Sequence, residues 1–173
     1  MRKLIPGVVI IVFTVLASLL IMGIIRKIQN QKYITEKISK LPSFSFKRVT
    51  KGLFSSSEIK GGPVLIVHFH PECEHCRYEI SEIMKSGIPA SGTKVILISS
   101  AHPDSITKFL SQYNLPDFPS IISLADTAYL FGDIFGSERI PSNYIYNKEL
   151  KLVKVVHGEV NTGTILKYLP DSE

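Results

Sequence analysis

The chain has 173 residues, of which 45% are hydrophobic, and a formal net charge of +5. This length is enough for one domain with its own hydrophobic core and one further segment. Four of the 20 lysines and arginines flank an apolar N-terminal segment, so the remaining 16 nearly balance the 15 aspartates and glutamates. No basic run interleaved with aromatic residues follows, and the composition therefore argues against nucleic-acid binding.

The N-terminal segment 4–25 contains no charged residue across its 22 positions. A helix of this length crosses the hydrocarbon core of a bilayer, and no face of this one is polar. We therefore expect a membrane anchor over residues 1–27 rather than the buried helix of a soluble protein. A cleaved signal peptide is the alternative, but no clear small-x-small cleavage site follows Gly23.

Residues 28–42 are polar and rich in lysine, which predicts a linker, with a folded domain over residues 43–173. The charges beside the apolar segment bear on its orientation. Two basic residues precede it and five follow: Arg2 and Lys3, then Arg26, Lys27, Lys32, Lys37 and Lys40. By the positive-inside rule, this count would leave the domain in the cytoplasm.

The residue pattern of the domain predicts alternating strands and helices. Apolar runs and alternation predict strands over residues 44–49, 64–69, 94–99, 120–124, 143–146 and 152–156. Helical spacing predicts helices from Cys73 to about residue 86 and over 103–113, 127–135 and 162–169, the last stopped by Pro170, with a serine-capped turn at 55–59. Parallel strands joined through a helix and followed by a terminal hairpin predict an α/β fold with a mixed central sheet and helices on both faces.

The only two cysteines, Cys73 and Cys76, lie between the strand 64–69 and the helix that follows. A Cys-x-x-Cys motif in this context indicates redox chemistry. At the first turn of a helix, unpaired backbone N–H groups and the helix dipole stabilise a thiolate, and a protonated His75 would add positive charge beside it. We therefore expect Cys73 to attack a partner and Cys76, one turn later, to resolve the mixed disulfide.

On these features the chain resembles the thioredoxin fold, and more narrowly the membrane-anchored thiol–disulfide oxidoreductases of the TlpA/ResA type. The resemblance covers residues 42–170. The residues that carry it are an added strand from Phe44, the segment 62–69 leading into Cys73 and Cys76, Arg77-x-Glu79, Ile140-Pro141 before a strand, and Gly158 before the last helix.

The resemblance implies roles for further residues. Pro141 is expected to be cis and to lie against the dithiol, while the backbone of Ile140 binds an extended substrate. Glu79 is expected to act in proton transfer or substrate choice, and Glu74 and His75 to contact the substrate. Between the cysteines, glutamate is typical of reductants and histidine of strong oxidants. The chain has no tryptophan ahead of the motif, where such proteins usually have one and where His70 stands.

The resemblance also implies the cofactor requirement, the partners, the location and the redox direction. No cofactor is expected, because the Cys73–Cys76 pair itself carries two electrons. Expected partners are thiol- or disulfide-containing proteins, including cytochrome c apoproteins and other secreted proteins. The expected location is the bacterial inner membrane with the domain in the periplasm, where disulfides persist. This orientation is opposite to the one that the count of basic residues predicts. A reductant is favoured over an oxidant.

Other functions compete with this one. The cysteines could form a structural disulfide, or join nearby histidines and Glu72 in a copper chaperone. Zinc is disfavoured, since no second Cys-x-x-Cys supplies four ligands. We therefore expect no resident metal, and we expect His68 and His157 to be structural. A peroxidase is less favoured, because the threonine and arginine that accompany a peroxidatic cysteine cannot be placed.

Overall fold

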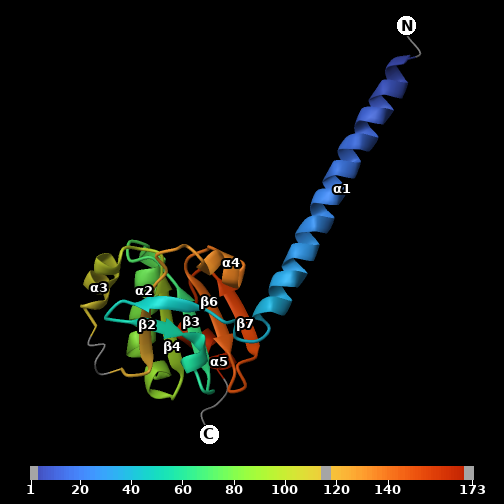
Figure 1. Ribbon diagram of the computed structural model, residues 1–173. Coiled ribbons are helices and arrows are strands. Elements are labelled where there is room, and N and C mark those ends of the chain that lie inside the picture. Colours follow the sequence, from blue (N-terminus) through green and yellow to red (C-terminus); the bar gives the residue numbers. More distant parts are fainter. Residues whose placement is uncertain (1–3, 114–117, 170–173) are drawn as a thin grey trace. The chain divides into compact units, whose positions relative to one another are not determined.

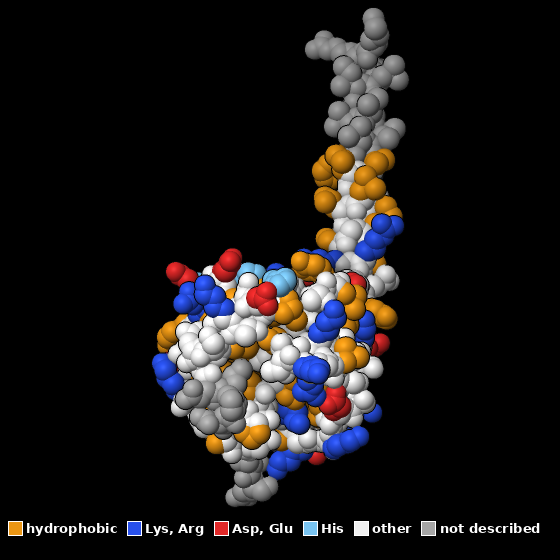
Figure 2. All heavy atoms as spheres, turned by 60° about the vertical axis from the view of Figure 1, so that its left-hand side comes forward, with side chains coloured by type: hydrophobic (Ala, Val, Ile, Leu, Met, Phe, Trp, Pro, Cys, Tyr) orange, Lys and Arg blue, Asp and Glu red, His pale blue; other side chains and the backbone are white. Residues whose placement is uncertain are grey.

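A computed structural model describes residues 4–113 and 118–169. The chain forms two compact units, Met1–Glu36 and Lys37–Glu173. The first consists of helix α1 (Leu4–Ile38) up to Glu36. Its stretch Phe13–Ile38 is long and apolar enough to cross a membrane, and Figure 2 shows hydrophobic side chains exposed along it. The predicted linker is helical as far as Ile38, because no glycine or proline interrupts residues 24–38.

The second unit is built on one sheet, which within the described residues has seven strands in the order β2-β1-β5-β4-β3-β6-β7 (Figure 1). The parallel centre consists of β3 (Val64–His68), β4 (Lys94–Ser99) and β5 (Ile121–Ala125). Antiparallel strands extend it on both sides: β6 (Ser142–Tyr146), β7 (Leu152–His157), β1 (Ser45–Arg48) and β2 (Leu53–Ser55). This arrangement confirms the predicted mixed sheet.

Helices cover the sheet because its central strands are apolar on both faces. On one face, Leu65 and Val67 of β3 share a core with three helices: α2 (Glu74–Lys85), α3 (Pro103–Leu110) and α5 (Thr162–Tyr168). On the other face lies α4 (Phe131–Phe135), where Phe131 and Phe135 pack on Tyr144 of β6. Alternation along β3 and β6 thus sends neighbouring residues into two different cores.

The predicted helix over 127–135 is wrong in its first turn. The carboxylate of Asp126 accepts hydrogen bonds from the backbone N–H groups of Leu130 and Phe131, at 3.0 and 2.8 Å. Tyr129 has a left-handed φ of 56°. These features hold the residues after Asp126 in a turn, so α4 begins only at Phe131.

Smaller differences concern short elements. The serine-capped turn is confirmed as a 3-10 helix, η1 (Ser56–Glu58), with a capping box between Ser55 and Glu58. Strand β2 was not predicted, and α3 ends at Leu110 rather than at residue 113. A second 3-10 helix, η2 (Ile88–Ala90), follows α2. The predicted stop at Pro170 lies outside the described residues.

Candidate functional site

The two cysteines lie at the junction of β3 and α2. Cys73 is the N-cap of α2, and its sulfur accepts a hydrogen bond from the backbone N–H of Cys76 at 3.3 Å. This confirms the predicted placement of Cys73 at the start of the helix. Both are free thiols, Cys73 partly exposed and Cys76 completely buried. A protein partner can therefore reach the sulfur of Cys73 more readily than that of Cys76.

The surroundings of Cys76 oppose its ionisation. Burial raises the pKa of the Cys76 thiol well above its usual value, and its hydrogen bond with Cys73 and the negative charge of Glu79 act in the same direction. Because only a thiolate attacks a disulfide efficiently, Cys76 needs a group that takes its proton before it can resolve a mixed disulfide.

Glu79 lies three residues after Cys76 in α2 and is completely buried. Its Oε1 accepts a hydrogen bond from Asn143 Nδ2 at 3.0 Å, and its Oε2 accepts one from the backbone N–H of Val160 at 2.7 Å. Burial raises the pKa of Glu79 to about 7, although both hydrogen bonds lower it; the charge of Glu159 raises it further. Glu79 therefore holds or releases a proton near neutral pH.

The loop before α5 joins this region to two other predicted site residues. Gly158 N–H donates to the carbonyl oxygen of Pro141 at 2.8 Å, and the Ile140–Pro141 peptide bond is cis, as expected. Next in the loop, Glu159 Oε2 lies 2.6 Å from His75 Nδ1. Residues 158–160 thus contact the loop that contains Ile140 and Pro141 (the proline loop), His75 between the cysteines, and the buried carboxyl group of Glu79.

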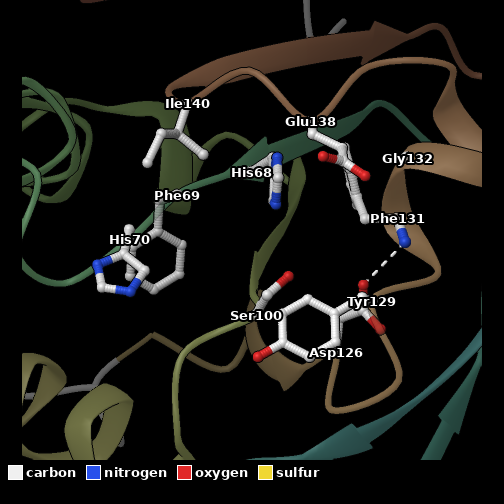
Figure 3. A pocket seen from close by; sticks show the side chains of 10 residues that line it. All are labelled: His68, Phe69, His70, Ser100, Asp126, Tyr129, Phe131, Gly132, Glu138 and Ile140. Atoms are coloured by element: carbon white, nitrogen blue, oxygen red, sulfur yellow. Dashed lines mark hydrogen bonds between the residues drawn. The ribbon is translucent and has the colours of Figure 1, made fainter.

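A pocket of about 210 Å³ opens beside the proline loop (Figure 3). Ile140, which is 41% exposed, and His70 from the loop before Cys73 lie on one side, with Tyr129 and Glu138 on the other. The pocket shows that the loop before the cysteines and the proline loop border one common hollow. The exposed Glu74 is not among its lining residues.

The histidines of the metal-binding hypothesis have other partners. His68 is buried, stacks on Phe131 with ring centroids 3.9 Å apart, and has its Nδ1 3.3 Å from the carbonyl oxygen of Arg139. His157 Nδ1 lies 2.8 Å from Ser142 Oγ. In the described ranges, no group of three or more His, Cys, Asp or Glu side chains could hold a metal ion.

Sequence reasoning missed Asn143, Glu159 and the backbone of Val160. Their partners on α2 are 64 to 84 residues away in the chain, a separation at which no local pattern reports a contact. One signal was available for Asn143. An amide at the start of the predicted strand 143–146, which continues as Tyr-Ile-Tyr, must find a hydrogen-bond partner if the strand is buried.

Similar solved structures identify the fold. DsbF of Mycobacterium tuberculosis, in mixed oxidised and reduced forms, is similar with a TM-score of 0.64 and 16% identity, over 76% of this chain and 93% of that one. A thiol:disulfide interchange protein of the thioredoxin family from Chlorobium tepidum gives 0.63 and 19%, over 76% and 93%. StoA from Bacillus subtilis gives 0.58 and 12%, over 75% and 98%. The fold is therefore thioredoxin-like.

The family is given by sequence. The model of the AhpC/TSA family matches residues 39–155, more than half of the chain. The chain belongs to the AhpC/TSA family. A search of curated proteins found no match. The resemblance to thioredoxin-like oxidoreductases, stated from the sequence, is thus confirmed for fold and family.

Proposed function

We propose that this protein is a membrane-tethered thiol–disulfide oxidoreductase that reduces disulfides in protein partners. The observation that carries the proposal is the asymmetry of the cysteine pair. Cys73 is partly exposed at a helix N-terminus, whereas Cys76 is buried three residues before Glu79. An accessible attacking thiol followed by a sheltered resolving thiol suits a two-step exchange.

In the first step, the Cys73 thiolate attacks one sulfur of the partner's disulfide. The partner's S–S bond breaks, a mixed disulfide forms, and the second partner sulfur leaves as a thiolate. In the second step, Cys76 gives its proton to the carboxylate of Glu79 and attacks the Cys73 sulfur. The Cys73–Cys76 disulfide forms and the partner leaves with two electrons, its thiolates taking protons from solvent.

The partner is proposed to lie along Ile140, beside Pro141, with Glu74 and His75 at the rim of the site. Ile140 and His70 border the same pocket, which supports a single docking region next to Cys73. Cytochrome c apoproteins are one class of candidate partner. Helix α1 supports a membrane anchor, and the resemblance favours the periplasmic side of a bacterial inner membrane.

The test is to trap partners with Cys76→Ser. This variant keeps the attacking thiol and removes the resolving one, so mixed disulfides should accumulate in cells and disappear on reduction. Cys73→Ser is the matched control and should trap nothing. If Cys73→Ser traps the same partners as Cys76→Ser, the assignment of the two roles is wrong.

The reduction potential decides the direction of electron flow. The full chain in detergent is equilibrated with glutathione or dithiothreitol buffers, and its metal content is measured in parallel. A potential near that of thioredoxin, about −270 mV, supports a reductant. A potential near that of DsbA, about −120 mV, would make the protein an oxidant. Stoichiometric copper would overturn the proposal in favour of a chaperone.

A further inference from the structure

We propose that Glu159 is a positioning residue that holds the Cys73–Cys76 pair at a reducing potential by offsetting the positive charge that His75 carries when it is protonated. The inference rests on the proposed function and deepens it. It concerns a residue from the loop before α5 that acts on the dithiol through another side chain.

The contact itself is well defined. Glu159 Oε2 lies 2.6 Å from Nδ1 of His75, which stands between the two cysteines in the first turn of α2. The backbone on both sides of Glu159 is fixed, because Gly158 N–H donates to Pro141 O and Val160 N–H donates to Glu79 Oε2. Glu159 is therefore placed at the motif by two buried or partly buried anchors, unlike an ordinary surface carboxylate.

The charges have a definite effect on the thiols. A protonated His75 beside Cys73 stabilises the thiolate, which favours the reduced form and raises the reduction potential. Glu159 adds a negative charge at hydrogen-bond distance, so its pair with a protonated His75 has almost no net charge. The same carboxylate acts electrostatically on Glu79, where it favours the protonated form. Glu159 thus disfavours both the thiolate of Cys73 and the carboxylate of Glu79.

This pairing accounts for the mixed character of the dipeptide between the cysteines. Glu74 is the residue expected in a reductant and His75 the residue expected in an oxidant. A glutamate that cancels the charge of His75 removes the electrostatic feature by which histidine favours an oxidant. The chain can then retain a histidine at this position and still donate electrons.

The experiment compares Glu159→Gln with His75→Gln in the full chain in detergent. The readouts are the alkylation rate of Cys73 by iodoacetamide, which reports its thiolate fraction, and the equilibrium constant with glutathione. The side chains of Glu159 and His75 are 37% and 74% exposed, so solvent and salt weaken their electrostatic effect on the thiols. For Glu159→Gln we expect faster alkylation and a potential raised by roughly 14 to 30 mV, which is a threefold to tenfold change in the equilibrium constant.

His75→Gln should act in the opposite direction, because it leaves the charge of Glu159 unopposed. The double variant should return close to the wild type. A purely structural contact would instead shift both single variants in the same direction. Glu149→Gln is the charge control, since Glu149 lies in the exposed turn at the far end of β6 and β7 and should leave both readouts unchanged.

The outcomes separate this inference from the proposed function. If Cys76→Ser traps no partner and the wild-type protein does not exchange with glutathione, the proposed function fails. If wild-type protein exchanges normally and Glu159→Gln matches Glu149→Gln in rate and potential, only the role of Glu159 is overturned. Single variants that shift in the same direction would also overturn it.

Discussion

Two buried titratable groups, Glu79 and His68, lie near the same end of the sheet on opposite faces. Desolvation is the largest influence on both, and each pKa moves toward the neutral form of its group. The pKa of Glu79 is raised to about 7, and that of His68 is lowered to about 4. Burial therefore shifts the titration of Glu79 up to neutral pH and shifts the titration of His68 well below neutral pH.

The two groups also differ in what surrounds them. Glu79 accepts hydrogen bonds from Asn143 and Val160 beside the cysteines, and a change in its charge is felt by Cys76. His68 stacks on Phe131 in a core of aromatic rings. One face of the sheet is thus suited to moving a proton, and the other to holding the strand end that carries the motif.

The largest effect is expected on the aromatic face. Phe131 is 1% exposed and packs against His68, Phe135 and Tyr144. Phe131→Ala should lower the free energy of unfolding by about 3 to 5 kcal/mol, measured in urea on the domain or the full chain. Tyr129→Ala, at a position 71% exposed, is the control and should change it little. A loss below about 1 kcal/mol for Phe131→Ala would contradict the packing role.

Glu79→Gln tests the proton-transfer face. The folded-state pKa of Glu79, about 7, is above its usual 4.5, so the wild type should lose stability as pH rises from 4.5 to 7. Relative to Glu79→Gln, this loss should reach about 3 kcal/mol and level off above pH 7. Urea unfolding at a series of pH values measures it. Parallel curves for the two proteins would show that Glu79 ionises normally.

His68→Phe should reveal the opposite slope. The folded-state pKa of His68, about 4, is below its usual 6.5, so its contribution to stability is present above pH 6.5 and is lost as pH falls toward 4. Phenylalanine keeps the stacking on Phe131, and the carbonyl of Arg139 still accepts from Ser142 Oγ. The variant should lack this acid-side loss, at most about 3 kcal/mol. The same unfolding series decides the matter, and an unchanged slope would count against a neutral buried imidazole.

The smallest effect sharpens the account of Glu79. The hydrogen bond from Asn143 lowers the pKa of Glu79, so Asn143→Ala should raise the midpoint of its titration further above 7. We expect a change of about one pH unit or less, equivalent to about 1 kcal/mol. NMR of the labelled carboxyl carbon measures the midpoint. A midpoint that stays the same or falls would mean that water solvates the carboxylate at least as well as Asn143 does.

The sequence was informative where structure is local. The apolar run 64–69, the cysteine spacing and the serine at position 55 predicted β3, the start of α2 and η1 with small boundary errors. Ile140–Pro141 was found only through the family resemblance. The pattern failed where a long-range or single side-chain contact decides the outcome, as with Asp126 and the start of α4.

The same limit applies to the site. Cys73, Cys76 and Glu79 follow from one short motif, and their placement at the head and buried side of α2 was within reach of periodicity. The contacts of Glu79 with Asn143 and of His75 with Glu159 depend on how β6 and the loop before α5 pack against α2. Tertiary packing creates these neighbours, and no spacing in the sequence encodes them.

The added hairpin of β1 and β2 has a consequence for solubility. Without it, β5 would present its free backbone groups and the apolar side chains of Ile121, Ile122 and Leu124 at the border of the sheet. Such an uncovered strand invites pairing with a second chain and aggregation. The hairpin replaces it with β2, which is three residues long and stops at once in η1. At the opposite border, β7 carries Lys154 within the strand, and Lys151 just before it forms an isolated backbone β-bridge with Lys40. Both borders therefore resist the edge-to-edge association to which sheets with long free edges are prone.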